Sequence, residues 1–490
     1  MRVSRHGTKA NAEPDDRAHN AIARLNALDR SRSEEWAEYV HDGGDGQDED
    51  EDEGLRCGTD SGNGSGSKYS WTKALLVEAN VRNNRYRDIA SWDHALLPGP
   101  YLNASLIPPL PLPASTQPSR PQGQAYIASQ APPPHTFPAF FAHLCAQRVR
   151  VLVMLTPLTE RGLKKADQYW PSAGGGERSI PVRPTLSSRS AHLFHHQQKQ
   201  REQQLQQQSG GATSTTRSVN RRILNLPSSD WAVEVLEEQD LSTGPSPSSS
   251  SSSSASSPSP RPLPSGTHLQ LRRLRLHIGT RPSPSEYILA SQTPSGPSSE
   301  RAGLQQNLNT TSGGSGSTTH DLVQLHLSSW ADYGTDSLET LDILLDWIDH
   351  LQLRESTSSS SPSSSPSLSP PPIWIHCSAG VGRSGTVIAA HMLRNRNRHL
   401  PKPKPNSNEL IETTIPEERD RAFLLADCSL EHEHEHEDKA DADSTQRLAE
   451  VIAVVAYLRR FRPMMVQTPA QLEMVCGALA AATATDGPTG

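Results

Sequence analysis

One segment constrains this chain more than any other: residues 375–385, which read IHCSAGVGRSG. A short apolar strand is expected at Ile373–Ile375, and an apolar helix is expected over Gly382–Leu393. The loop between them contains glycines and carries Cys377, with Arg383 six positions further on. Successive N–H groups of such a loop converge on one point, and the helix N-terminus adds partial positive charge. The segment therefore predicts a cradle for an anion.

The same cradle predicts the chemistry of its cysteine. Arg383 can hold two oxygens of a phosphate through parallel hydrogen bonds. Its charge also favours a thiolate, so we expect a lowered pKa for the Cys377 thiol and a sulfur that is nucleophilic near neutral pH. The alternative is a buried core cysteine beside a loop that starts a helix, which the glycines and the arginine disfavour.

Apolar residues are spread unevenly along the chain. Only 33% of the 490 residues are hydrophobic, whereas ordinary globular chains have roughly 45–50% when glycine is counted. One compact domain over the whole length is therefore not expected. Long insertions in surface loops cost little stability, so segments rich in Ser, Pro, Gln or Gly are interpreted as disordered inserts. These are residues 172–218, 242–266, 281–319, 355–372 and 395–443.

Both ends of the chain are expected to lie outside the folded core. Residues 1–66 are polar and acidic, and they are interpreted as a disordered N-terminal region that can contain a short helix around 21–40. Residues 483–490 are expected to form a flexible tail. A single domain is expected over residues 67–482.

Charge, cysteines and apolar runs exclude several classes of protein. The net charge of −7 lacks the basic footprint of a nucleic-acid binder. Five cysteines in so long a chain are not a disulfide framework, and a reducing compartment fits better. No apolar window approaches about 18 residues, and the N-terminus lacks a secretory signal. We therefore expect no membrane span and a cytoplasmic protein, with the nucleus as the alternative location.

The ordered windows predict alternating strands and helices. Apolar runs and apolar–polar alternation predict strands, whereas helical periodicity predicts helices. The segment Arg221–Leu226 has the basic-then-apolar form of a kinase-docking peptide, but its place beside a predicted strand favours the start of a strand. A protein kinase is therefore kept as an alternative partner. Further strands are expected at 126–128, 149–155, 231–236, 268–276 and 322–327, and further helices at 136–147, 337–353, 445–461 and 469–481.

The loop at 375–385 resembles the signature loop of the protein-tyrosine phosphatases. In that family the cysteine attacks phosphorus and forms a cysteinyl-phosphate, the arginine binds the phosphoryl oxygens, and the Ser or Thr after it helps the thiolate leave. The resemblance implies these roles for Cys377, Arg383 and Ser384, and it implies no metal and no cofactor. The residues expected to surround the phosphate are Ser378, Ala379, Gly380, Val381 and Gly382.

Two further segments resemble the family's catalytic loops. Ser329–Gly334 is similar to the Trp-Pro-Asp loop, which implies that Asp332 is the general acid, with Ala331 where proline is usual. Val466–Gln471 is similar to the glutamine loop, so Gln467 would orient the hydrolytic water with the help of Gln471. The structural alternatives are a surface turn for the first segment and a helix cap for the second.

Two more segments supply the walls of the implied pocket. Asn80–Ile89 resembles the family's phosphotyrosine-recognition loop, in which Tyr86 would stack on the substrate ring and Asp88 would hold a backbone N–H of the substrate. The alternative is an ordinary turn that leads into a strand. Lys165–Pro171 resembles a segment whose lysine contacts the acid loop, which makes Lys165 a further site residue.

The resemblance implies one α/β phosphatase domain with a twisted mixed β-sheet flanked by helices. The expected activity is hydrolysis of phosphotyrosine in protein substrates. Two alternatives stay open: a phosphotyrosine-binding pseudophosphatase, suggested by Ala331 and the interrupted scaffold, and a dual-specificity phosphatase. The run Glu431–Glu437 alternates Glu and His, but a solvated stretch is preferred there and no metal site is predicted. The oligomeric state is not predicted.

Overall fold

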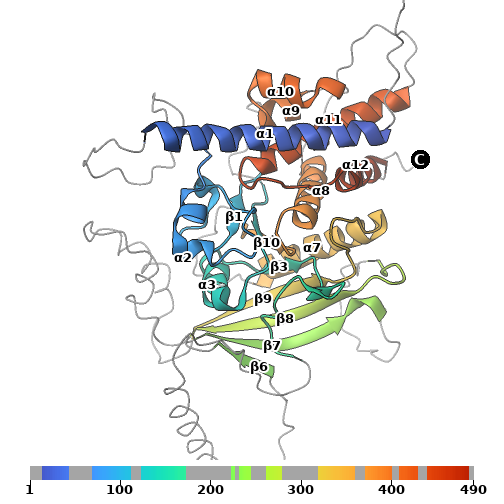
Figure 1. Cartoon of the computed structure of the whole chain (residues 1–490). Helices are drawn as coiled ribbons and strands as arrows, with labels where there is room; N and C mark the ends of the chain where they lie inside the picture. Colours follow the sequence, from blue (N-terminus) through green and yellow to red (C-terminus); the bar gives the residue numbers. More distant parts are fainter. Residues whose placement is uncertain are drawn as a thin grey trace, which may run out of the picture.

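The structure is a computed structural model that describes residues 14–43, 69–111, 123–172, 222–226, 231–243, 261–278, 318–358, 370–399, 408–428 and 439–484. Among these residues, an eight-stranded sheet runs in the order β1-β2-β10-β3-β9-β8-β7-β6 (Figure 1). Its strands are β1 Ala104–Ile107, β2 Tyr126–Ser129, β3 Val151–Met154, β6 Arg222–Asn225, β7 Trp231–Asp240, β8 Leu269–Ile278, β9 Thr318–Leu327 and β10 Ile373–His376. A separate pair is formed by β4 Thr159–Glu160 and β5 Leu163–Lys164.

The sheet is mixed, as expected. Strands β2, β10, β3 and β9 pair in parallel in that order. Strand β1 pairs with β2 in antiparallel fashion. On the other side of the sheet, β9, β8, β7 and β6 pair successively in antiparallel fashion. Strand β10 is buried on both faces: Ile373 and Ile375 belong to one apolar cluster and Trp374 belongs to the other. A central parallel strand of this kind carries an apolar run rather than an alternating pattern. Cys377 directly follows β10 and therefore lies at the end of the sheet where the parallel strands have their C-termini.

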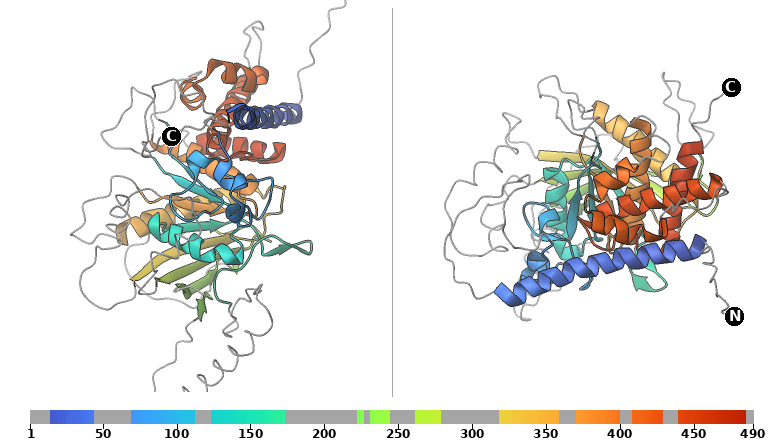
Figure 2. Two further views of the ribbon diagram at one scale, coloured as in Figure 1. Left: turned by 60° about the vertical axis from the view of Figure 1, so that its left-hand side comes forward. Right: turned by 90° about the horizontal axis from the view of Figure 1, so that it is seen from above.

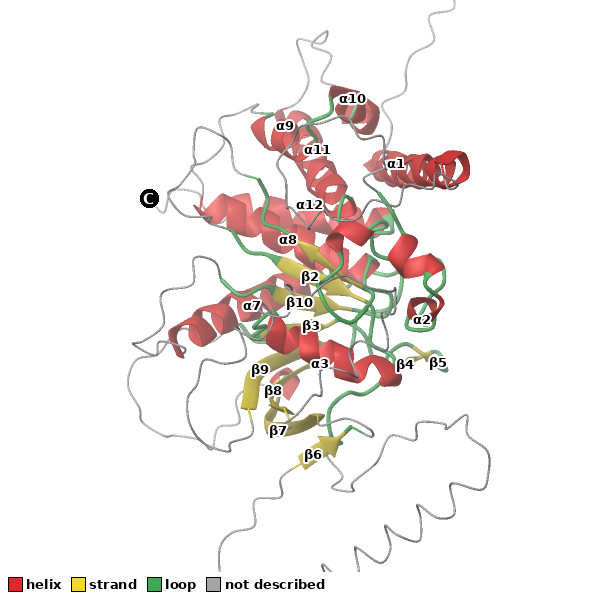
Figure 3. Cartoon of the chain, turned by 90° about the vertical axis from the view of Figure 1, so that its left-hand side faces the viewer, coloured by secondary structure: helices red, strands yellow, loops and turns green. Residues whose placement is uncertain are grey.

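Helices cover both faces of the sheet, which confirms the α/β class (Figure 3). Helix α3 Phe137–Ala146 packs its phenylalanines against one face. Helices α7 Leu338–Ser358, α8 Gly382–His399, α11 Lys439–Arg459 and α12 Pro469–Ala484 supply the cluster on the other face. No helix in the described ranges is long and apolar enough to cross a membrane. The remaining helices are α1 Pro14–Gly43, α2 Glu78–Val81, α9 Glu409–Thr414 and α10 Glu418–Leu424.

The expected strands and helices are all present, with shifted ends. Strands β7, β8 and β9 each span ten residues and are longer than expected, because antiparallel pairing continues through polar positions. Within the segment Arg221–Leu226, residues Arg222–Asn225 form strand β6, and Leu224 and Leu226 are buried in the core, which confirms the strand interpretation. The Glu431–Glu437 run lies outside the described residues.

The N-terminal region differs from the expectation. Helix α1 runs from Pro14 to Gly43, so it starts earlier and is longer than the helix expected around 21–40. It packs on α10, α11 and α12, and Figure 2 shows it along one side of the helical layer. Its buried apolar residues follow a helical spacing of three and four that the acidic, polar composition of residues 1–66 hides. They are Ala18, Ala21, Ile22 and Leu25.

The segment expected as an insert at 395–443 also contains folded structure. Helix α8 continues to His399, and helices α9 and α10 follow with Leu410, Ile411 and Leu424 buried in the main cluster. A few well-placed apolar residues are enough to anchor short helices, even where the average composition is polar. Most of the other expected inserts fall on residues outside the described ranges.

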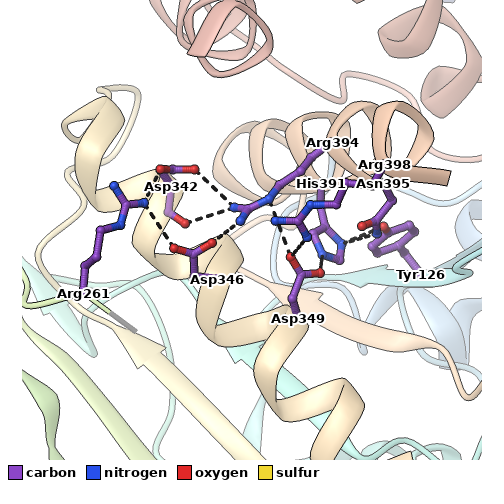
Figure 4. A network of polar contacts seen from close by, with 9 residues as sticks. All are labelled: Tyr126, Arg261, Asp342, Asp346, Asp349, His391, Arg394, Asn395 and Arg398. Carbon is purple, nitrogen blue, oxygen red and sulfur yellow. Dashed lines mark hydrogen bonds and ion pairs between the residues drawn. The ribbon is translucent and has the colours of Figure 1, made fainter. Parts of the chain in front are cut away.

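A polar network joins α7 to α8 (Figure 4). The buried His391 ring lies between two partners, with Nδ1 at 2.8 Å from the Tyr126 hydroxyl and Nε2 at 2.8 Å from Asp349 Oδ1. Arg398 also contacts the Asp349 carboxylate. Burial alone would raise the pKa of Asp349, but His391 and Arg398 hold it at about 2. The carboxylate therefore stabilises the contact between the two helices.

We expect Asp349→Asn to lower the free energy of unfolding at neutral pH by about 1–2 kcal/mol, discounted because a quarter of the side chain is exposed. The folded-state pKa of about 2 lies below the unfolded value of about 3.9. The stabilisation is therefore complete above about pH 4 and is lost as the pH falls toward 2. Urea unfolding of the two proteins between pH 7 and pH 3 measures the difference.

The matched control is Asp342→Asn on the same helix. Asp342 contacts Arg394 and Arg261, but 42% of its side chain is exposed, so we expect a loss below about 0.5 kcal/mol. Equal losses in the two variants, or a loss at Asp349 that does not change with pH, would contradict the assigned role.

Candidate active site

The loop that follows β10 has a backbone that only glycine fits. Gly380 has φ +78°, and a Cβ atom added there would lie 2.0 Å from the Ser129 carbonyl oxygen. The loop therefore lies directly against the end of β2. Helix α8 begins at Gly382, so its free N–H groups face the same loop. The strand, the glycine loop and the helix start thus have the arrangement from which the sequence predicts an anion cradle.

Cys377 lies at the floor of this cradle and is 3% exposed. Burial alone would raise the pKa of its thiol. The Arg383 guanidinium, the hydroxyl and N–H of Ser384, and the Gly380 N–H at 3.2 Å from Sγ outweigh burial and lower the pKa below its ordinary value. The buried Ser384 hydroxyl has no hydrogen-bond partner elsewhere in the described part of the chain. The predicted thiolate is thus favoured by its surroundings.

Arg383 and Asp332 meet above the thiol. Arg383 is buried and donates one hydrogen bond to the Trp330 carbonyl at 2.8 Å and another to Asp332 Oδ1 at 2.9 Å. Lys165 donates to Asp332 Oδ2 at 2.5 Å, and this bond raises the pKa of Lys165. The Asp332 N–H donates to Glu160 at 3.0 Å. The acid loop is therefore held over the cradle, with its carboxylate between two cations.

The recognition loop forms a wall of the site. The Tyr86 hydroxyl lies 2.7 Å from Ser378 Oγ, which in turn donates to the Lys165 carbonyl at 2.7 Å. Gln130, directly after β2, accepts from the Arg85 N–H at 2.7 Å and donates to the Asn83 carbonyl at 2.7 Å. These bonds fix the height of the Tyr86 ring relative to the cradle.

The glutamine loop lies across the start of α8. A Cβ atom added at Gly382 would lie 2.7 Å from Gln467 Oε1 and 3.1 Å from the amide of Gln471. The Gln467 N–H donates to Gln471 Oε1 at 2.9 Å. Glycine at position 382 thus allows both side-chain amides to approach the cradle.

These residues line one pocket. Of the predicted site residues, Ser384, Gly380, Val381 and Lys165 do not belong to its lining, whereas Ile89 and Tyr333 join the lining without having been predicted. No group of His, Cys, Asp or Glu suited to a metal ion occurs in the described ranges. The lining residues are Tyr86, Asp88, Ile89, Asp332, Tyr333, Cys377, Ser378, Ala379, Gly382, Arg383, Gln467 and Gln471.

Sequence reasoning missed the cation beneath the cradle. Arg462 is fully buried and donates to the carbonyls of Gly380 at 2.8 Å and Ala379 at 2.9 Å, and to the Ser91 hydroxyl at 2.7 Å. Burial lowers its pKa to about 10, so it stays charged at neutral pH. By holding these two carbonyls, Arg462 restrains the loop backbone from which the Gly380 N–H contacts Cys377 Sγ. Its place five positions before Gln467 was the available signal.

Comparison with known proteins finds one family and several relatives that are similar in sequence. A sequence model described as protein-tyrosine phosphatase matches residues 80–231 and 298–422, together more than half of the chain. Tyrosine-protein phosphatase 99A of Drosophila melanogaster is 38% identical over 105 residues, which cover 19% of this chain and 7% of that protein. Receptor-type tyrosine-protein phosphatase S of Gallus gallus is 36% identical over 118 residues, which cover 22% and 7%. The chain thus spans less than a tenth of the length of these two curated relatives.

Solved structures show similar chains at low identity. Protein tyrosine phosphatase TbPTP1 of Trypanosoma brucei is 20% identical with a TM-score of 0.44, covering 86% of this chain and 87% of that chain. PTPN18 in complex with HER2 phosphopeptides is 17% identical with a TM-score of 0.43, covering 83% of each chain.

Proposed function

Because the chain belongs to the protein-tyrosine phosphatase family, we propose that it hydrolyses phosphotyrosine in proteins through a cysteinyl-phosphate on Cys377. The observation that carries the proposal is the buried Cys377 thiol, whose pKa is lowered and which lies in one pocket with Arg383 and Asp332. We also propose a single phosphatase domain over residues 67–482. Helix α1 packs on helices α10, α11 and α12 of this domain. A cytoplasmic location stays a prediction, as does a protein-kinase partner.

In the first step, the Cys377 thiolate attacks phosphorus and the bond from phosphorus to the tyrosyl oxygen breaks. The two N–H donors that Arg383 now directs to Trp330 and Asp332 are the ones that would hold the phosphoryl oxygens. Asp332, in its protonated form, gives its proton to the leaving oxygen. Charge builds up on the phosphoryl oxygens, where the fixed donors of the cradle stabilise it.

In the second step, water attacks phosphorus and the bond from sulfur to phosphorus breaks. The Gln467 amide, close to Gly382 at the mouth of the cradle, would orient this water. Asp332, now ionised, accepts the proton of the water. The thiolate leaves toward the Ser384 hydroxyl, which has no other partner in the described residues. Phosphate is released and the enzyme is regenerated.

The experiment that tests the proposal is turnover of a phosphotyrosyl peptide, followed by acid quenching and mass spectrometry of the peptide that contains Cys377. We expect phosphate release and a phosphate adduct on Cys377. Phosphopeptide binding without turnover would favour the pseudophosphatase alternative instead. A chain whose Cys377 has been alkylated should be inactive. Retained turnover in that chain, without any phosphate adduct, would contradict the proposed mechanism.

We propose that Tyr86, which lines the pocket, makes it deep enough to favour phosphotyrosine over phosphoserine. We expect Tyr86→Ala to lower kcat/KM for a phosphotyrosyl peptide by about tenfold, because the substrate ring loses its stacking partner. Activity on the matching phosphoseryl peptide should start low and stay unchanged. The measurement is kcat/KM for both peptides with both proteins.

The matched control is Tyr86→Phe, which keeps the ring and removes only the hydroxyl that contacts Ser378. It should retain most of the preference for phosphotyrosine. If Tyr86→Ala leaves the preference for phosphotyrosine over phosphoserine unchanged, Tyr86 does not set this preference. That result would favour the dual-specificity phosphatase.

A further inference from the structure

The backbone just before Gln467 has an unusual conformation. Met464 has φ +62° and Val466 has φ +59°. Residues other than glycine rarely adopt this region, and for a β-branched side chain such as valine it is a clear outlier. Such a conformation persists only where the surrounding structure over-determines it. The contacts that restrain residues 464–466 therefore decide where Gln467 lies.

One side of the segment is held by the phosphate-binding loop. The Val466 N–H donates to the Val381 carbonyl at 3.2 Å. A Cβ atom added at Gly385 would lie 2.5 Å from the Val466 nitrogen, so the segment lies directly against the first turn of α8. This contact couples the position of the segment to the cradle of Cys377.

The other side is held by Arg459, the last residue of α11. Its side chain is almost fully buried and donates to the Met465 carbonyl at 2.9 Å and to the Val466 carbonyl at 2.8 Å. Arg459 therefore fixes two consecutive peptide groups immediately before Gln467. Where a buried guanidinium is paired with a carboxylate, removing that partner leaves an uncompensated buried charge and is strongly destabilising.

That partner comes from α1. Asp29 Oδ2 accepts from Arg459 at 3.0 Å and also from the Met464 N–H at 2.9 Å, and Asn26 accepts from Arg459 at 2.9 Å. Asp29 is 7% exposed, and no other carboxylate lies within ion-pair distance of Arg459 in the described part of the chain. One carboxylate thus binds both the arginine and the strained backbone that it supports.

We propose that Asp29 is a positioning residue for Gln467, and that α1 thereby takes part in the second step of the reaction. This inference rests on the proposed function, in which Gln467 orients the hydrolytic water. Both ends of the contact lie outside the residues that the family model matches, 80–231 and 298–422. Without Asp29, residues 464–466 lose two of their restraints, and Gln467 moves away from the water position.

The test is Asp29→Ala in the full-length chain. We expect kcat to fall by about tenfold, because a small displacement of a reacting group is enough to cause such a loss. The value of kcat/KM should stay unchanged, since it reports the steps up to phosphoryl transfer to Cys377. The fraction of enzyme trapped as Cys377-phosphate by acid quenching at steady state should rise.

Two variants separate positioning from general stability. Thr445→Val removes the hydroxyl that accepts from Arg17 at 3.0 Å, which is another polar contact between α1 and α11. It should leave kcat and the trapped fraction unchanged. Asp29→Asn keeps an acceptor oxygen for the Met464 N–H and should restore part of kcat, which also covers the case in which the alanine variant folds poorly.

A double-mutant cycle with Gln467→Ala completes the test. If Asp29 acts through Gln467, Asp29→Ala lowers kcat no further once Gln467 is replaced. The inference is overturned if Asp29→Ala lowers kcat and kcat/KM together, changes neither, or has its full effect in the Gln467→Ala background. Failure of the proposed function would appear differently, as an absence of trapped Cys377-phosphate in the native chain.

Discussion

Replacing Cys377 by serine is expected to lower kcat for p-nitrophenyl phosphate by a factor on the order of 10⁵. The cradle lowers the pKa of a thiol, but a serine hydroxyl ionises far less readily and stays neutral in the same field. The Arg383 guanidinium and the loop N–H groups remain, so binding of a phosphotyrosyl peptide should survive. Steady-state kinetics and binding to a phosphopeptide column measure the two effects.

The lowered pKa adds a pH-dependent signature. In the native chain the pKa of the Cys377 thiol lies below its ordinary value, so iodoacetamide should inactivate the enzyme at pH values at which an ordinary thiol reacts slowly. Two other cysteines are internal controls, because burial raises the pKa of Cys145 and of Cys476 to about 12. They should stay unmodified under the same conditions.

The matched variant is Cys145→Ser, which should keep full activity because Cys145 lies on α3, away from the pocket. Retention of turnover in Cys377→Ser, or equal alkylation of Cys377 and Cys145, would show that Cys377 is not the nucleophile.

The sequence predicts the parts of this site that depend on short-range order. Cys377 and Arg383 lie six positions apart between a strand and a helix, so local geometry alone brings them together. The contact of Lys165 with the acid loop was expected from the family resemblance, and the 2.5 Å bond to Asp332 agrees with it. The sequence therefore predicts site residues that are close to one another along the chain or belong to a known motif.

The sequence does not predict the buried residues that hold the loops of the site, because these residues act through contacts between distant segments. Asp29 and Arg459 are 430 positions apart, and neither lies in a motif that indicates the other. Arg462 is one of three arginines close together at positions 459, 460 and 462, and only the fold shows that it binds the carbonyls of the cradle. Average composition also hid the full length of α1 and its packing on the core, because its apolar residues are few but regularly spaced.

Replacing Asp332 by alanine is expected to lower kcat for a phosphotyrosyl peptide by about 10²–10⁴-fold, the usual contribution of a general acid. The loss should be smaller for p-nitrophenyl phosphate, because p-nitrophenolate leaves more readily than tyrosinate and needs less protonation. Asp332 now shares the Arg383 guanidinium, so its removal also frees a donor for the phosphoryl group. The variant should therefore bind phosphotyrosyl proteins at least as tightly as the native chain and retain them.

Asp336→Ala is the matched control on the same loop. Its carboxylate contacts Ser329 at 3.3 Å and the Ser337 N–H at 2.7 Å, and it does not line the pocket. This change can loosen the loop but removes no acid from the site, so its effect on kcat should be small and equal for the two substrates. The fall in kcat depends on the leaving group only if the variant loses protonation of that leaving group. Equal losses on both substrates in Asp332→Ala would therefore mean that Asp332 orders the loop through Arg383 and Lys165, and that another group protonates the tyrosyl oxygen.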